Sequence, residues 1–208
     1  DKKYASKDYR GAITDYSQIL IDNPNDLNAL FQRALAKSYL DDHEGAIKDY
    51  TRVIEINPEY ASAFYNRGLS KDEMEDSYGA ISDYSKAIAI NGKHKNAFIY
   101  RGYAKSDIGD HEGAIKDLTS AIEIDPEDPF GYNGRGYVKE KAGDYYAAIS
   151  DYSKAIKIDP ENDYSYSGRA YAKWMIGDKN GATNDFTKAI QLNPVSYTHL
   201  RAHETQTH

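Results

Sequence analysis

The feature that most constrains this chain is a sequence repeat with a period of 34 residues. The segments "EGAIKDYTRVIEINP" from Glu44 and "EGAIKDLTSAIEIDP" from Glu112 show it plainly. One alanine and one aspartate return at this interval six times: Ala12, Ala46, Ala80, Ala114, Ala148 and Ala182, with Asp15, Asp49, Asp83, Asp117, Asp151 and Asp185. A period that never slips over six copies predicts an array of one small structural unit stacked on itself.

Each repeat has the pattern of two helices joined by a turn. Apolar and small residues recur at helical spacing, a Gly-Asp or Asp-Asp pair interrupts them, and a second amphipathic stretch ends at Asn-Pro or Asp-Pro. Gly109, Gly143 and Gly177 can adopt the left-handed conformation that ends a helix. The aspartate after each of them suits a helix N-cap. The sequence therefore predicts an all-α chain.

The upstream half of the repeat returns as well, for example as "RGLSKDEMED" from Arg67 and "RGYAKSDIGD" from Arg101. Together the two halves match the signature offsets of a known repeat family, in one copy at Phe64, Gly68, Ala80, Tyr84 and Ala87. Over residues 1 to 194 the chain resembles a bacterial-type array of the tetratricopeptide repeat family. The resemblance implies an α-solenoid, a right-handed superhelix of antiparallel helix pairs. It also implies a partial repeat at 1–26 and full repeats at 27–60, 61–94, 95–128, 129–162 and 163–194.

Two departures from the family pattern recur in all five full repeats, an arginine where leucine is usual and a lysine where tyrosine is usual. A residue present in every repeat must serve packing, because an active site is one unique constellation. We expect Arg33 to pair with Asp49, and the equivalent residues to pair likewise, as a structural ladder. The lysines are expected to cover apolar surface with their stems and to reach water with their ammonium groups. Isoleucines are expected to fill the interior: Ile54, Ile88, Ile122, Ile156 and Ile190.

No catalytic or cofactor chemistry is expected. Absence of cysteine excludes thiolate catalysis and cysteine metal sites, and the glycines do not form a phosphate-binding loop. His43 and His111 share a position that other repeats fill with tyrosine or lysine, so neither is a catalytic candidate. His94 is expected to be a solvated linker residue. We therefore predict a protein that is not an enzyme and needs no cofactor or metal.

Residues 195–208 break the repeat. The stretch "VSYTHLRAHET" from Val195 resembles a translated DNA-sequencing adaptor, so we expect a non-native tail and exclude it from functional reasoning. This exclusion includes His199 and His203, whose spacing of four resembles that of zinc ligands on a helix. Both ends of the chain are then expected to be truncations.

The charge balance limits the classes of partner. The chain has 33 Asp and Glu against 26 Lys and Arg, a formal net charge of −7, which argues against binding nucleic acid. No stretch approaches the roughly 20 apolar residues of a membrane span. We expect neither nucleic acid nor membrane as a partner. The compartment stays open, with the cytoplasm slightly favoured.

The resemblance implies that a partner peptide or helix binds the concave face formed by the first helices of the repeats. It assigns contacts to the second, fifth, ninth, twelfth and thirteenth positions of each first helix. Aromatic and large apolar residues stand at many of them: Phe31, Leu35, Tyr65, Leu69, Tyr103, Phe130, Tyr137, Tyr164, Tyr171 and Trp174. Acidic residues are expected to flank this stripe: Asp72, Glu73, Asp107 and Glu140. The alternative is that the rings only fill gaps between neighbouring first helices.

These residues predict a protein-interaction scaffold whose partner carries apolar or aromatic anchors and some basic character. The carboxylate clamp of the family's chaperone-tail binders is not expected, because the Lys and Asn pattern that it needs is missing. The alternative function is a regulatory or substrate-docking arm of a larger enzyme. Self-association through the open ends of the array also remains as a hypothesis.

Overall fold

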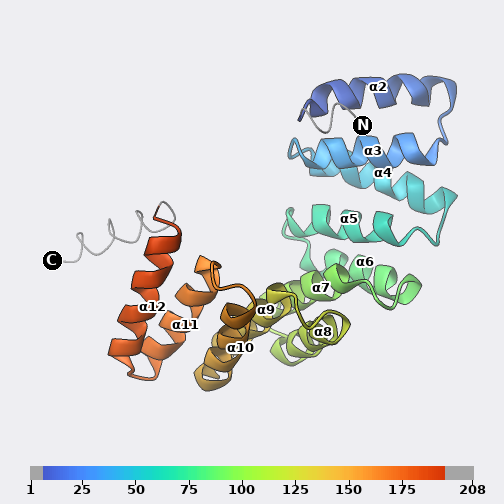
Figure 1. Cartoon of the computed structure of the whole chain (residues 1–208). Coiled ribbons are helices and arrows are strands. Elements are labelled where there is room, and N and C mark those ends of the chain that lie inside the picture. Colours follow the sequence, from blue (N-terminus) through green and yellow to red (C-terminus); the bar gives the residue numbers. More distant parts are fainter. Residues whose placement is uncertain (1–6, 195–208) are drawn as a thin grey trace. The chain divides into compact units, whose positions relative to one another are not determined.

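The computed structural model describes residues 7–194, which form helices joined by short turns, with no strand among them (Figure 1). The helices are α2 Tyr9–Asp22, α3 Leu27–Ser38, α4 His43–Ile56, α5 Ala61–Asp72, α6 Ser77–Ile90, α7 Lys95–Asp107, α8 His111–Ile124, α9 Pro129–Lys141, α10 Tyr145–Ile158, α11 Asp163–Met175 and α12 Lys179–Leu192. In this described part of the chain, no helix is both long enough and apolar enough to cross a membrane. The predicted all-α fold is confirmed. The tail, with His199 and His203, lies outside the described residues.

The helices belong to two compact units. Unit 1 ends at Ile108 and contains α2 to α7, and unit 2 begins at Gly109 and contains α8 to α12. Within each unit every helix packs against the next one in chain order. We call α3, α5, α7, α9 and α11 first helices and the others second helices. First helices also meet each other, α3 with α5, α5 with α7, and α9 with α11, so each unit carries one surface made by them. These stacked helix pairs are the predicted α-solenoid architecture.

The turn inside each repeat combines a left-handed residue with an N-cap. Gly109, Gly143 and Gly177 have φ angles of 85°, 82° and 86°, as predicted, and the side chain of Asp144 accepts a hydrogen bond from the Ala147 amide at 3.1 Å. The first two full repeats have Asp41 and Glu75 at the glycine position, with φ angles of 60° and 62°. A residue with a Cβ atom is strained there, since the left-handed region costs it roughly 1–2 kcal/mol.

Glycine substitution at this position tests whether the strain is real. Glu75→Gly should raise the free energy of unfolding by about 0.5–1 kcal/mol, and Gly143→Ala should lower it by about 1 kcal/mol. Urea denaturation of both variants beside the wild type measures the two changes. A lower stability for Glu75→Gly would mean that the Glu75 side chain makes contacts that outweigh the backbone strain.

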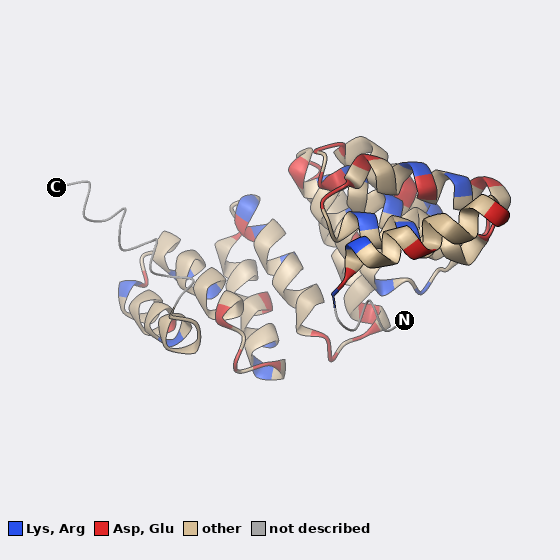
Figure 2. Ribbon diagram, turned by 90° about the horizontal axis from the view of Figure 1, so that it is seen from above, with Lys and Arg blue, Asp and Glu red and all other residues tan. Residues whose placement is uncertain are grey.

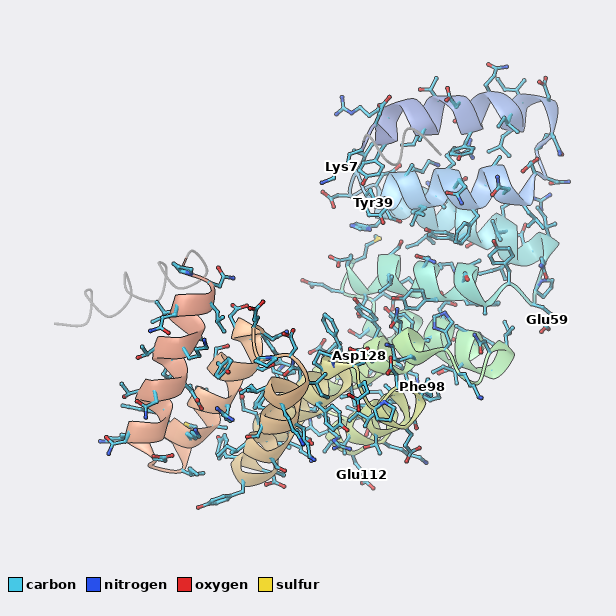
Figure 3. All side chains as sticks on the ribbon, viewed as in Figure 1. Lys7, Tyr39, Glu59, Phe98, Glu112 and Asp128 are labelled. Carbon is cyan, nitrogen blue, oxygen red and sulfur yellow. The ribbon has the colours of Figure 1, made fainter. Side chains whose placement is uncertain are left out.

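Tyrosines of the second helices, rather than the predicted isoleucines, fill most of the interior. Tyr50, Tyr84 and Tyr152 are among the largest fully buried side chains. The rings of Tyr84 and Tyr152 occupy space that glycines on the first helices leave free: a Cβ atom on Gly68 would lie 2.7 Å from Cε1 of Tyr84. Of the five isoleucines named above only Ile122 is buried. The expectation was wrong for the other four: Ile54, Ile88 and Ile156 are half-buried on helices whose central space is taken by a tyrosine ring, and Ile190 on the last helix is exposed. Side chains fill the spaces between neighbouring helices of each unit (Figure 3).

The predicted ion pairs are present in both units. Arg67 donates from Nε and Nη2 to the two carboxylate oxygens of Asp83, at 2.8 and 2.7 Å, and Lys71 Nζ lies 2.8 Å from the same carboxylate. The same three-residue arrangement, which we call the ion-pair triad, occurs at Arg33, Lys37 and Asp49, at Arg135, Lys139 and Asp151, and at Arg169, Lys173 and Asp185. The lysine side chains remain partly exposed, but their ammonium groups also bind the carboxylate, a role that the sequence did not predict. A buried carboxylate that binds arginine still has lone pairs to satisfy, and the lysine supplies the next donor.

Each arginine also bonds to the repeat before its own. Its Nη1 donates to a hydroxyl sixteen residues earlier, on the preceding second helix, for example from Arg67 to Thr51 at 3.0 Å and from Arg169 to Ser153 at 3.1 Å. Burial alone would raise the pKa of Asp185, but hydrogen bonds from Arg169 and Lys173 outweigh it and lower that pKa below its usual value. The carboxylate is therefore held ionised, and the arginine joins two repeats through one side chain.

Removing either partner of a triad should have unequal effects. Arg67→Leu leaves Asp83 paired with Lys71, so we expect a modest loss of stability, below about 2 kcal/mol. Asp83→Leu leaves two partly buried cations without their carboxylate and should cost about 3–5 kcal/mol. Denaturant unfolding of the two variants measures both. If Arg67→Leu proved the more damaging change, the aspartate would not be the centre of the triad.

Candidate partner-binding surface

All ten residues predicted to contact a partner lie on first helices. In unit 1, α3 carries Phe31 and Leu35, α5 carries Tyr65 and Leu69, and α7 carries Tyr103. In unit 2, α9 carries Phe130 and Tyr137, and α11 carries Tyr164, Tyr171 and Trp174. None of the ten is buried. The ten residues chosen by their sequence spacing are therefore half-buried or exposed. The two units differ in how much of each ring neighbouring side chains cover.

In unit 1 the predicted residues are half-buried and pack among other rings. The Phe31 ring lies 5.6 Å from the Tyr50 ring and 5.3 Å from the Tyr60 ring, measured between centroids. Leu35 is half-buried too, and Leu69 packs against the buried Tyr84. The alternative that these side chains fill gaps between helices thus describes part of their role in unit 1.

A group of four tyrosines gathers where α5, α6 and α7 meet. The Tyr65 ring lies 6.0 Å from both the Tyr84 and the Tyr100 rings, and Tyr100 lies 6.2 Å from Tyr103. We call Tyr65, Tyr84, Tyr100 and Tyr103 the tyrosine cluster. Tyr100 is 38% exposed and was not among the predicted residues, because it stands at the sixth position of its helix rather than the fifth. Its neighbour Ile99, at the fifth position, is buried.

In unit 2 the predicted aromatic residues are largely exposed. Phe130 is 62% exposed, Trp174 53%, Tyr164 47% and Tyr171 44%. The neighbouring Met175, which was not predicted, is also exposed. Within the described residues, neighbouring helices thus cover these four rings less than they cover the predicted rings of unit 1.

Two of the predicted aromatics in unit 2 lie under lysines of the chain itself. Lys141 Nζ lies 5.0 Å from the centre of the Tyr137 ring, and Lys179 Nζ lies 5.7 Å from the Trp174 ring. Both distances fall within the range of cation–π attraction. Aromatic residues of the first helices thus already hold ammonium groups in this protein.

Three of the predicted acidic residues form a cluster in unit 1, which we call the acidic cluster: Asp72, Glu73 and Asp107. Burial, and then the like charges of Asp107 and Glu73, raise the pKa of Asp72 to about 6. Acidic and basic residues are interleaved over the helices of unit 1 (Figure 2), so this cluster is a local feature rather than part of a uniformly acidic surface. In unit 2, Glu140 accepts a hydrogen bond from the Tyr152 hydroxyl at 3.1 Å.

The histidines take structural positions. His43 and His111 begin α4 and α8. His94 is not the solvated linker residue that was expected, because it is half-buried, caps α7 through its Nδ1, which accepts from the Ala97 amide, and lies 4.8 Å from the Tyr65 ring. Burial lowers the pKa of His94, which keeps the ring neutral as the cap requires. Among residues 7–194 no group of His, Cys, Asp and Glu is arranged to hold a metal ion.

Comparison with solved structures identifies similar folds. The MamA protein is 23% identical, with 81% of this chain and 92% of that chain covered and a TM-score of 0.71. YrrB, described as a TPR protein with an unusual peptide-binding site, is 19% identical over 91% and 97% of the two chains, with a TM-score of 0.69. A tetratricopeptide repeat protein from Parabacteroides merdae is 24% identical over 92% and 75%, with a TM-score of 0.72. A search of curated proteins gave no significant match.

Family profiles match the sequence directly. Profiles described as tetratricopeptide repeat match residues 61–94, 98–128 and 129–162, and a profile described as TPR repeat matches residues 39–71. Together they cover more than half of the chain, and their helix pairs are those of the structure. The chain therefore belongs to the tetratricopeptide repeat family.

Proposed function

We propose that this chain is a protein-interaction scaffold that binds a partner peptide or helix on the surface of its first helices. The observation that carries the proposal is the distribution of exposed apolar side chains in unit 2. Of the seven large ones among its described residues, five lie on the first helices α9 and α11: Phe130, Tyr164, Tyr171, Trp174 and Met175. The other two, Tyr146 and Ile190, lie on second helices.

Exposed aromatic side chains on rigid helices suit partner binding for a physical reason. A tyrosine or tryptophan loses little conformational entropy when a partner covers it, and it offers an apolar face together with one polar group. Residues of this kind dominate the binding energy of many protein interfaces. The proposed contacts in unit 1 are Phe31, Leu35, Tyr65, Leu69 and Tyr103, and those in unit 2 are Phe130, Tyr137, Tyr164, Tyr171 and Trp174.

The fold supports a protein or peptide as the partner. Tetratricopeptide arrays are generally scaffolds without catalytic activity, and the similar YrrB structure is described as having a peptide-binding site. The acidic cluster favours a partner segment with some basic character, because opposite charges attract across an interface and repel a wrong partner. The alternative function, a regulatory or substrate-docking arm of a larger enzyme, would use the same surface. The sequence of the complete gene would distinguish it from a scaffold by showing whether a catalytic domain is encoded with the array.

Alanine substitution of the exposed rings tests the proposal. Peptides are first selected from a random phage-displayed library on the purified full chain, and their dissociation constants are then measured with variants. Tyr171→Ala and Trp174→Ala should each cost about 1–3 kcal/mol of binding free energy. Tyr146→Ala removes a still more exposed ring from a second helix and should leave the affinity unchanged. Failure to select any peptide, or equal losses in all three variants, would contradict the proposed surface.

Stability measurements separate binding from packing. Tyr171→Ala should leave the urea midpoint close to that of the wild type, because the ring is already nearly half exposed. Tyr152→Ala, at a fully buried position, should cost about 3–5 kcal/mol of folding stability. If Tyr171→Ala destabilised the chain as strongly as Tyr152→Ala, its effect on affinity would reflect packing. Light scattering at two protein concentrations reports self-association in the same samples.

A further inference from the structure

The acidic cluster and the tyrosine cluster of unit 1 lie together at one place in the fold. Asp72 and Glu73 end α5, and Asp107 ends α7. Asp72 interacts electrostatically with Asp107 and with Glu73, so the three carboxylates share one local field. The like charges of Asp107 and Glu73 destabilise the ionised form of Asp72, so a cation that arrives beside Asp72 is favoured.

The hydroxyl of Tyr84 interacts electrostatically with Asp72 and Glu73 and has no hydrogen-bond partner among the described residues. Tyr84 is fully buried, and its hydroxyl oxygen is one of three buried side-chain polar atoms without a partner in the described residues. Burial, and then the charge of Asp72, raises the pKa of this hydroxyl far above its usual value, with Tyr65, Tyr100 and Glu73 adding to the effect. The hydroxyl is therefore neutral and close to these four side chains. A buried polar group without a partner is costly, so a donor that reached it would be stabilised.

The equivalent tyrosine of unit 2 shows what is missing around Tyr84. Tyr152 stands two repeats later and donates its hydroxyl hydrogen to Glu140, which is the counterpart of Asp72. Aspartate is one methylene shorter than glutamate, and the Tyr84 hydroxyl makes no such bond. In unit 2 the tyrosine and the acidic residue at these two positions are hydrogen-bonded to each other. In unit 1 the tyrosine hydroxyl at the equivalent position makes no hydrogen bond.

We propose that the acidic cluster and the tyrosine cluster of unit 1 together form a subsite for one basic side chain, lysine or arginine, of the partner segment. The subsite rests on the proposed function, because it supplies one contact of that segment. The carboxylates provide the opposite charge, the exposed ring of Tyr100 provides an aromatic face, and the Tyr84 hydroxyl provides an acceptor. Lys141 over Tyr137 is an example of an ammonium group on a tyrosine of a first helix in this protein.

The charges facing Asp72 determine how binding should depend on pH. Glu73 lies beside it on α5, α6 contributes the neutral Tyr84, and α7 contributes Asp107. On the other sides, α3 offers the Ser38 hydroxyl, bonded to Ser70, and α4 packs against α5 through Ile54 and Thr51. Lys71, the residue before Asp72 in the chain, is bound to Asp83. Since the pKa of Asp72 is about 6, its charge is lost as the pH falls below 6, and cation binding should weaken there.

The test uses a small probe, so that it does not depend on finding a partner. The ¹⁵N-labelled full chain is titrated with Nα-acetyl-lysine methylamide and, separately, with Nα-acetyl-norleucine methylamide, which lacks the ammonium group. The lysine probe should shift the amide signals at the ends of α5 and α7, and the norleucine probe should not. The shifts should be larger at pH 7.5 than at pH 5.

Variants assign the binding to the subsite. Asp72→Asn with Glu73→Gln should weaken the lysine probe at least tenfold. The matched control, Glu59→Gln with Glu161→Gln, removes two charges from exposed turn residues and should leave binding unchanged; Glu59 lies at the outer edge of unit 1 (Figure 3). Tyr84→Phe should weaken binding about tenfold to a hundredfold, as expected for one hydrogen bond to a charged group. The last repeat has Phe186 at this position, so the ring without a hydroxyl fits the fold.

Each outcome decides between the claims. Lysine-specific shifts at α5 and α7 that are lost in the Asp72 and Glu73 variant support the subsite. Equal shifts with both probes, shifts spread over acidic residues elsewhere, or unchanged shifts in that variant overturn it. If Tyr84→Phe leaves probe affinity unchanged, the hydroxyl is not part of the subsite and the proposal fails in that respect. Failure to select peptides on the full chain would instead overturn the proposed function, whatever the lysine probe does.

Discussion

The interaction on which the structure depends is the buried aspartate carboxylate bound by arginine and lysine. It joins the two helices of one repeat, and the same arginine reaches the hydroxyl of the repeat before. A buried carboxylate of this kind is tolerated only if nearly all of its hydrogen-bonding capacity is used, which fixes the relative position of three helices. The family usually has leucine at the arginine position and tyrosine at the lysine position. In this chain the contact between repeats is therefore directional, because hydrogen bonds specify angles that apolar contacts leave free.

Most of the fold could be predicted from the sequence because its signals are local and recur. Helix periodicity, the aspartate caps and the left-handed glycines each act within a few residues, and repetition separates them from chance. The pairing of Arg67 with Asp83 also followed from recurrence. The part played by Lys71 did not, since a sequence shows that a lysine recurs but not that a buried carboxylate nearby still lacks a donor. The interior tyrosines were missed for a similar reason, because the space for Tyr84 exists only where Gly68 on another helix leaves it.

The candidate surface was predictable in position but not in exposure. Helix register placed the aromatic residues on first helices, yet register says nothing about the neighbour that covers a ring. In unit 1, Phe31 packs between Tyr50 and Tyr60, whereas Phe130 in unit 2 is mostly exposed. Tyr100 was missed because its exposure depends on how α7 meets α5. Equivalent positions in a repeat array thus lie on equivalent helices, but their side chains differ in exposure and in the residues that they contact.

The backward bond of each arginine gives the array a polarity along the chain. Each repeat takes from its predecessor a hydroxyl acceptor, sixteen residues before the arginine, at Ser17, Thr51, Ser85, Thr119 and Ser153. A repeat added at the C-terminal end of the array has the hydroxyl acceptor for its arginine in the repeat before it. Deletion of an N-terminal repeat removes the acceptor of the next arginine and leaves that donor without a partner. Arrays of this type can therefore lengthen or shorten during evolution more easily at their trailing side.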